Sequence, residues 1–264
     1  MTSFDHSSHD EFVAYYAKAS QSREALERFR SIRDAVLRVL RRAGSRAEAL
    51  EVADIGCGAG TQCFLWEEGG HRAHGLDVNE PLLALARERA QAAGRPVDFR
   101  IGTATELPWA DASMDVCLVL ELLEHVTAWE ACLAEFDRVL RPGGVLVVTT
   151  TNKLCPRQQE FRLPLYSWYP ARLKRRFERM ASTTHPHLAN FATYPAVNWF
   201  SFSSLAAALP PAAYDCLDRF DVMDPSRLRP ALRGVLTLVR GVPPLRWLAH
   251  VATPGTLLFG VKRT

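Results

Sequence analysis

A glycine-rich segment carries the clearest chemistry in this sequence. At residues 52–60 an apolar run leads directly into Gly56, Gly58 and Gly60. Glycines between a strand and a helix let the backbone approach a ligand closely. A dinucleotide loop would follow the spacing G-x-G-x-x-G, but Thr61 stands where the third glycine belongs, and Gly60 comes one position early. The segment therefore predicts a ligand-binding loop whose register is wrong for NAD.

Two carboxylates accompany this loop. Asp54 lies directly before it, and a negative charge there suits a cationic amino-acid tail better than a pyrophosphate, which it would repel. Asp77 ends the next predicted strand, about 20 residues beyond the loop, where an acidic residue can accept both ribose hydroxyls. Asp77 could instead cap the helix that follows.

A third group of polar residues, Glu121, Glu124 and His125, follows the fourth predicted strand. Because ligands in open parallel sheets bind at the carboxyl ends of strands, these residues are candidates for proton transfer or for orienting a substrate hydroxyl. Helical spacing would place Glu121 and Glu124 on one side of the next turn. We expect His125 to act as base; an equally weighted interpretation is that Glu124 and His125 only cap and hydrogen-bond the next helix.

Short apolar runs alternate with helical patterns in the first part of the chain, which predicts a parallel sheet wrapped by crossover helices. The expected strands cover residues 51–55, 73–77, 97–101, 115–120 and 145–150. Before them, apolar residues at helical spacing predict a helix over residues 24–42. Asn79 is expected to cap another helix.

The pattern changes after residue 151. Residues 152–210 are rich in Pro, Arg and aromatic residues without a clear period, which indicates an inserted cap. Its aromatic side chains could line an acceptor pocket or form the cap's own core. They include Phe161, Tyr166, Trp168, Tyr169, Phe191, Tyr194, Trp199 and Phe200. Strands are expected at 217–222 and 256–261, with a helical region at 228–248 between them.

Together these motifs resemble the class I S-adenosylmethionine-dependent methyltransferases. The resemblance rests on D-x-G-x-G-x-G at residues 54–60, on Asp77, on Leu-Glu-His-Val at 123–126 and on Leu-Arg-Pro-Gly-Gly at 140–144. Residues 120–126 are similar to the ubiquinone-biosynthesis O-methyltransferases and related small-molecule enzymes. The resemblance implies S-adenosylmethionine as cofactor and a Rossmann-like α/β fold. That fold has a seven-stranded, mostly parallel sheet with one antiparallel strand near its end.

The resemblance also implies the cofactor contacts. The glycine loop with Asp54 would hold the methionine part, Asp77 the ribose and Val78 the adenine face. Where many relatives have an acidic residue that contacts the adenine amine, this chain has Thr103, so its hydroxyl or the backbone at Ala104 would make that contact. The full expected set is Asp54, Gly56, Cys57, Gly58, Gly60, Asp77, Val78, Thr103, Ala104 and Glu121.

We interpret the chain as four segments. Residues 1–50 form an N-terminal helical lid that includes Tyr15 and Tyr16, and residues 51–151 form the S-adenosylmethionine-binding core. Residues 152–210 form the cap on the substrate side, and residues 211–264 complete the sheet. The lid and the cap are expected to close over the active site and to select the substrate.

The expected reaction is methyl transfer to an oxygen, or a nitrogen, of a small aromatic or apolar molecule. Two alternatives stay open: a lyase or cyclase that uses the same cofactor, and a lipid or quinone methyltransferase at a membrane surface. Nucleic acid is a disfavoured substrate, because Glu121-Leu122-Leu123 replaces the N/D-P-P-Y/F motif that follows strand four in enzymes methylating nucleic-acid amino groups.

Charge is distributed unevenly within the net +3. Residues 1–150 carry 16 Lys/Arg against 23 Asp/Glu, whereas residues 151–264 carry 16 against 6. In the cap, Lys174, Arg175, Arg176 and Arg179 could meet an anionic group. The apolar tail at 228–250 carries four interspersed arginines and could seat a helix on an anionic membrane. Because Pro243-Pro244 interrupts that helix, we favour packing on the sheet.

Composition predicts a cytoplasmic protein. No stretch of about 20 apolar residues is present, and the first ten residues do not resemble a secretion signal. The six cysteines are scattered, which favours reduced thiols. His185 and His187 flank a proline, so a turn is favoured over a metal pair, and no metal site is expected.

Overall fold

The computed structural model describes residues 18, 20–158, 160–189 and 196–263. It divides into two compact units. Unit 1 comprises Met1–Val119, Glu130–Val147 and Val261–Thr264, and unit 2 comprises Leu120–Trp129 and Val148–Gly260. The predicted lid residues Tyr15 and Tyr16 and the cap residues Phe191 and Tyr194 lie outside the described residues.

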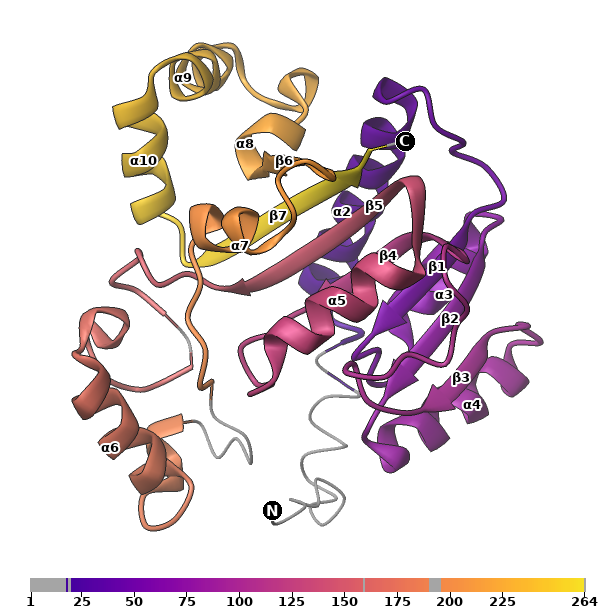
Figure 1. Cartoon of the computed structure of the whole chain (residues 1–264), viewed down its shortest axis with the longest axis horizontal. Coiled ribbons are helices and arrows are strands. Elements are labelled where there is room, and N and C mark those ends of the chain that lie inside the picture. Colours follow the sequence, from indigo (N-terminus) through magenta and orange to yellow (C-terminus); the bar gives the residue numbers. More distant parts are fainter. Residues whose placement is uncertain (1–17, 19, 159, 190–195, 264) are drawn as a thin grey trace. The chain divides into compact units, whose positions relative to one another are not determined.

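The described residues contain a seven-stranded sheet in the order β3-β2-β1-β4-β5-β7-β6 (Figure 1). The strands are β1 (Glu51–Ile55), β2 (Arg72–Asp77), β3 (Asp98–Ile101), β4 (Met114–Leu120), β5 (Leu140–Thr151), β6 (Tyr214–Asp218) and β7 (Gly255–Lys262). β1 pairs in parallel with both β2 and β4, and β2 pairs in parallel with β3. The predicted seven-stranded, mostly parallel fold is confirmed. Its strand order reverses between β1 and β4, where open parallel sheets bind ligands.

The helices in the described part of unit 1 are α2 (Arg23–Arg42), α3 (Thr61–Glu68), α4 (Glu80–Ala92) and most of α5 (Trp129–Val139). The predicted N-terminal helix is confirmed as α2, and it buries Val36, Val39 and Leu40 at helical spacing. Asn79 caps α4 as predicted, because its side chain accepts a hydrogen bond from the Leu82 N–H at 3.0 Å.

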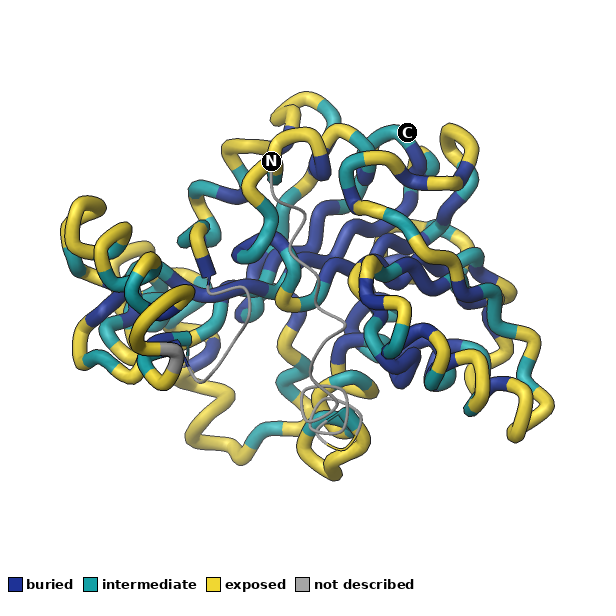
Figure 2. Tube along the Cα trace, turned by 90° about the horizontal axis from the view of Figure 1, so that it is seen from below, coloured by how far each residue is buried: buried dark blue, intermediate teal, exposed yellow. Residues whose placement is uncertain are grey.

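The core of unit 1 lies along its parallel strands. Val52 and Ala53 of β1 and Val116 and Leu118 of β4 are completely buried. Strands that are buried on both faces need a nearly continuous apolar sequence. The runs at β1 and β4 could therefore be recognised as strands although apolar and polar residues do not alternate in them. Figure 2 shows buried residues on the extended runs of the trace and exposed residues mainly on coiled segments and loops.

The cap region of unit 2 has more order than its sequence indicates. It contains η2 (Tyr166–Trp168), α6 (Ala171–Ala181), η3 (Pro186–Ala189) and α7 (Phe202–Ala208). Phe161 and Tyr166 stack at 4.1 Å between ring centroids and form a core with Ala181 and Ala189. These aromatic side chains therefore pack on one another, as one of the two sequence interpretations expected.

Lys174, one of the four basic residues on α6 that were expected to meet an anionic group, is partly buried. Its ammonium group donates to the Ser167 carbonyl at 2.8 Å and lies 4.4 Å from the centroid of the Trp199 ring. Burial lowers the pKa of Lys174. This lysine therefore stabilises the cap core through a cation–π contact, which differs from the expected anion contact.

The strand predicted at residues 217–222 is wrong. The chain forms β6 up to Asp218 and then the short helix α8 (Arg219–Val222). The Asp218 carboxylate accepts hydrogen bonds from the Phe220 and Asp221 N–H groups at 2.8 and 3.1 Å. This side-chain cap overrides the apolar alternation that favoured a strand.

The predicted tail helix is interrupted at the prolines, as expected. It becomes η4 (Pro225–Arg227), α9 (Pro230–Gly241) and α10 (Pro243–Val251). Packing of these helices on the sheet stays a prediction. Leu236 is the buried residue of α9 and α10 has none, while Arg246 and His250 of α10 pair with Asp218 at the end of β6. Within the described residues, no helix combines the length and apolar character that a bilayer span requires.

Candidate functional site

The glycine loop is fixed to the end of β2 by its own backbone. The N–H groups of Gly56 and Cys57 both donate to the Leu76 carbonyl, at 2.7 and 3.0 Å, and the Gly60 N–H donates to the Cys57 carbonyl at 2.9 Å. Gly56, Gly58 and Gly60 have φ values of +80°, +51° and +76°. The loop therefore uses a conformation that side-chain-bearing residues rarely adopt.

Gly60 and Gly58 are required for different structural reasons. A Cβ atom on Gly60 would lie 2.5 Å from Phe99 Cζ, so this position is needed for packing α3 against the sheet. A Cβ atom on Gly58 would meet Leu82 Cδ1 at 3.9 Å as its nearest described neighbour. Gly58 is thus the position at which the backbone is open to a ligand.

Asp77 joins the loop to the turn after β2. Its Oδ2 accepts from the Gly58 N–H at 2.7 Å and its Oδ1 from the Asn79 N–H at 2.8 Å. Burial raises the pKa of Asp77, while these backbone hydrogen bonds oppose that rise. The alternative that Asp77 caps α4 is wrong, since Asn79 is the cap. Each carboxylate oxygen retains a lone pair for a ribose hydroxyl.

Asp54 lies inside unit 1, 4% exposed at the end of β1. Burial raises its pKa to about 7, although the Cys63 thiol, which donates to Oδ2 at 3.5 Å, opposes this and the charge of Asp77 adds to it. The carboxyl group is therefore half-ionised near neutral pH. A nearby cation would shift it to the charged form.

The remaining predicted cofactor residues follow β2 and β3. The Val78 side chain is 57% exposed and is available to an adenine ring. The Thr103 hydroxyl lies 2.9 Å from the Thr105 hydroxyl and accepts from the Thr105 N–H at 3.3 Å. Ala104 is buried. The Thr103 oxygen thus already has partners within its own turn.

The predicted acid–base residues lie in unit 2, in the turn after β4. Glu121 has a positive φ of +52°, and its N–H donates to the Thr149 carbonyl at 2.9 Å. A residue other than glycine in this conformation costs about 1–2 kcal/mol. Such strain persists only where the surrounding structure holds it, commonly at functional sites.

Glu124 is completely buried beside Glu121. Among the described residues, no backbone N–H of another residue donates to either of its carboxyl oxygens. Burial first, and then the negative charge of Glu121, raise the pKa of Glu124 well above its ordinary value. This environment favours the protonated form of the Glu124 carboxyl group, and its side chain caps no helix.

Comparison with known proteins identifies the segment that carries the loop. The family described as "Methyltransferase domain" matches residues 53–148. This segment is a class I S-adenosylmethionine-dependent methyltransferase domain. S-adenosylmethionine is the cofactor of that family.

The curated relatives of this methyltransferase domain match it over a limited part of their length. The ubiquinone biosynthesis O-methyltransferase of Rhizobium rhizogenes is 38% identical over 106 residues, which cover 40% of this chain and 43% of that protein. A probable S-adenosylmethionine-dependent methyltransferase of Mycolicibacterium smegmatis is 37% identical over 116 residues, 44% of each chain. The chain thus spans less than half the length of these relatives.

A solved structure extends the likeness in fold. The S-adenosylmethionine-dependent methyltransferase from Mesorhizobium loti superposes with a TM-score of 0.53 at 18% identity, covering 87% of this chain and 98% of that one. This likeness concerns the fold alone. It includes chain beyond the methyltransferase domain, in agreement with the strands β6 and β7 that complete the sheet.

Three residues near the turn after β4, which carries Glu121 and Glu124, were not predicted. Glu160 is largely buried, and this burial together with the charge of Glu121 raises its pKa to about 7. Arg219 is also largely buried, which lowers its pKa, although the charges of Asp218 and Glu121 oppose this. The Asn198 amide donates to the Leu123 and Val126 carbonyls at 2.9 and 2.7 Å. No local motif marks these residues, because they reach the turn of the methyltransferase domain from distant parts of the sequence.

His125 lies in the same turn, and its N–H donates to the Leu122 carbonyl at 3.0 Å. Its role as base remains a prediction. His185 and His187 have ring centroids 5.7 Å apart, and His185 Nδ1 lies 2.7 Å from the Thr184 hydroxyl. In the part of the chain that the structure describes, no group of three or more His, Cys, Asp or Glu side chains is arranged to hold a metal ion.

Proposed function

We propose that this protein transfers the methyl group of S-adenosylmethionine to a hydroxyl oxygen of a small aromatic or apolar molecule. The single observation that carries the proposal is the Asp77 carboxylate held against the glycine loop by the Gly58 N–H at 2.7 Å. Such a carboxylate can accept both ribose hydroxyls where the open backbone at Gly58 admits the ligand. The names of the curated relatives favour oxygen over nitrogen as acceptor.

In this proposal unit 1 binds the cofactor. The glycine loop and Asp54 take the methionine part, Asp77 the ribose, Val78 the adenine face, and Thr103 and Ala104 the adenine edge. Asp54, with a pKa of about 7, becomes charged when it meets the amino-acid ammonium group. When bound, S-adenosylmethionine supplies an electrophilic methyl group on a sulfonium leaving group.

In this proposal the residues of the turn after β4 act on the acceptor. A hydroxyl group must lose its proton as its oxygen is methylated, and a base works best when its pKa lies near the working pH. Glu160, with a pKa of about 7, meets this condition and is a second candidate base in addition to the predicted base His125. Burial, and then the charge of Glu121, favour the protonated form of Glu124, which could donate a hydrogen bond that orients the acceptor.

Calorimetric titration with S-adenosylmethionine and its demethylated product tests the cofactor part. Wild type should bind both, and Asp77→Ala should weaken binding at least roughly tenfold, as expected for loss of a bidentate carboxylate contact. Glu88→Ala, which removes an exposed carboxylate of α4, is the matched control and should bind like wild type. Failure of the wild type to bind either ligand would refute the proposal.

Screening phenols, quinols and amines with a labelled methyl donor tests the acceptor part. We expect labelled methyl ethers from hydroxyl compounds, detected by mass spectrometry. Consumption of the cofactor with no methylated product would favour the lyase or cyclase alternative. Methylation of amines alone would move the acceptor atom from oxygen to nitrogen.

A further inference from the structure

Helices α9 and α10 expose an unusual amount of apolar surface. Six large side chains on them are between 40% and 57% exposed. They are Leu232, Val235, Leu238, Leu245, Trp247 and Leu248, which we call the α9–α10 apolar face. On α9 the spacing of three residues places these side chains along one side of the helix. Soluble domains rarely expose clustered apolar residues unless they serve as a contact surface.

The same segment carries positive charge without any negative charge. Residues 225–251 contain five arginines and no Asp or Glu. Arg229 and Arg233 are exposed, on helix α9 or directly before it. An apolar strip flanked by arginines is complementary to a surface that is both apolar and anionic.

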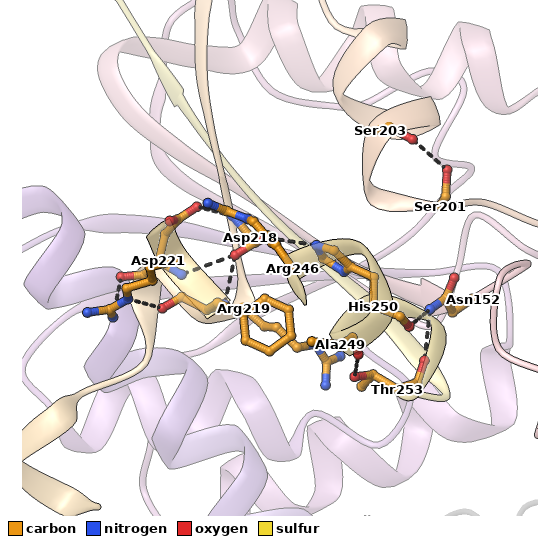
Figure 3. Close-up of polar contacts among 12 residues, drawn as sticks. Asn152, Ser201, Ser203, Asp218, Arg219, Asp221, Arg246, Ala249, His250 and Thr253 are labelled. Atoms are coloured by element: carbon orange, nitrogen blue, oxygen red, sulfur yellow. Dashed lines mark hydrogen bonds and ion pairs between the residues drawn. The ribbon is translucent and has the colours of Figure 1, made fainter. Parts of the chain in front are cut away.

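Buried polar contacts fix the inner side of these helices, as Figure 3 shows for α10. Arg246 Nε lies 2.7 Å from Oδ2 of the completely buried Asp218, and Arg246 also pairs with Asp221. His250 Nε2 lies 2.8 Å from the same Asp218 oxygen. Burial alone would raise the pKa of Asp218, but the hydrogen bonds from His250 and Arg246 outweigh it and hold the pKa at about 2.

Helix α9 is anchored in a similar way. Arg240 donates to the Phe220 and Met223 carbonyls, each at 2.8 Å. Two of the five arginines thus attach the helices to α8 and its flanks. The helices that carry the exposed apolar face are therefore fixed by side-chain contacts and are not a frayed end of the chain.

We propose that the α9–α10 apolar face docks on the surface of an anionic phospholipid bilayer. The apolar side chains would enter the boundary between headgroups and acyl chains, while Arg229 and Arg233 would contact lipid phosphates. Trp247 suits this depth, because tryptophan is enriched at membrane–water interfaces. The helices lie on the membrane and do not cross it, in agreement with their short length.

The charge of this segment favours a lipid surface, and not a second copy of this chain, as the partner of the α9–α10 apolar face. A symmetric dimer through this face would bring the same surface of each copy together, and therefore arginine against arginine, with no acidic residue in residues 225–251 to pair them. Anionic lipid supplies the missing negative charge. The inference does not depend on the proposed methyl transfer, because the surface is defined by these helices alone.

Co-sedimentation of the full chain with vesicles tests the proposal. Wild type should bind phosphatidylcholine vesicles that contain phosphatidylglycerol and bind pure phosphatidylcholine roughly tenfold or more weakly, since each arginine near an anionic surface contributes about a fivefold gain. Raised salt should weaken the binding to anionic vesicles. Leu238→Ser with Trp247→Ser, and separately Arg229→Gln with Arg233→Gln, should each weaken binding roughly tenfold.

Two control variants make the result specific. Ile101→Ser removes a side chain of similar exposure, 56%, from β3, and Arg23→Gln removes an arginine that is 90% exposed on α2. Both should bind like wild type, and circular dichroism should confirm that all variants retain the folded signal. Absence of binding to anionic vesicles, or equal binding by the α9–α10 variants, would overturn the proposal. So would concentration-dependent dimerisation without vesicles that the same variants abolish.

Discussion

At the scale of a single residue, the proposed contact of the Asp54 carboxyl group with the cofactor should make cofactor binding depend on pH. Its pKa in the free protein is about 7, and the cofactor's ammonium group favours its charged form. Binding should therefore release a proton near neutral pH, and affinity should fall as the pH drops below about 7. Titration calorimetry in buffers of different ionisation enthalpy measures both effects. Asp54→Asn should bind more weakly and lose the proton release; a wild type whose binding releases no proton would contradict the role given to Asp54.

Glu124 should make the folded state less stable as the pH rises, whereas a salt-bridged acid makes it more stable. Its pKa is raised in the folded state, so unfolding releases a proton at neutral pH and stability falls as the pH rises above the unfolded value of about 4.5. Glu124→Gln keeps the shape and removes this penalty. In thermal unfolding, the stability of Glu124→Gln relative to wild type should therefore be higher at pH 8 than at pH 5.

The exposed Glu130→Gln variant is the matched control for that measurement and should follow wild type at both pH values. If Glu124→Gln were equally destabilised at pH 5 and pH 8, the carboxyl group would be ionised in the fold. Its proposed role as a neutral hydrogen-bond donor to the acceptor would then be wrong.

Within the glycine loop, Gly60 is needed for packing and Gly58 for access of the ligand to the backbone. Gly60→Ala should lose about 2–3 kcal/mol of stability, since φ is +76° and the new Cβ would lie 2.5 Å from Phe99. Gly58→Ala carries only the cost of its positive φ, about 1 kcal/mol, but should weaken cofactor binding. Gly70→Ala, also at positive φ with no described atom within 4 Å, is the control for backbone strain alone. Equal destabilisation of all three variants would contradict this distinction.

Elements and motifs with local signals could be predicted from the sequence, and those fixed by distant contacts could not. Strand β1 was located residue by residue, and the Asn79 cap was identified, because apolar runs and cap chemistry are local. The helix α8 was missed because Asp218 caps it with two hydrogen bonds, and the spacing of apolar residues carries no information about such bonds. Glu160 and Arg219 were missed because only folding brings their charges to Glu121.

At the scale of the whole molecule, charge and function divide along the chain. The first 150 residues carry 16 Lys/Arg and 23 Asp/Glu, and the segment 225–251 carries five arginines and no acid. The acidic part contains the glycine loop, where we propose that Asp54 and Asp77 contact the cationic amino-acid tail and the ribose of the cofactor. The basic part contains the α9–α10 apolar face. Two ligands of opposite charge should therefore bind separate parts of one protein.

Hydrogen exchange monitored by mass spectrometry tests this division directly. Adding the demethylated cofactor should slow exchange in peptides that cover residues 54–60 and 77–82, because their backbone surrounds the predicted ligand. Adding phosphatidylglycerol vesicles should slow exchange in peptides from 230–251 and leave the first set unchanged. Asp77→Ala should lose only the first protection, and Leu238→Ser with Trp247→Ser only the second. Protection of one region by the other region's ligand would contradict the independence of the two surfaces and would reveal coupling between them.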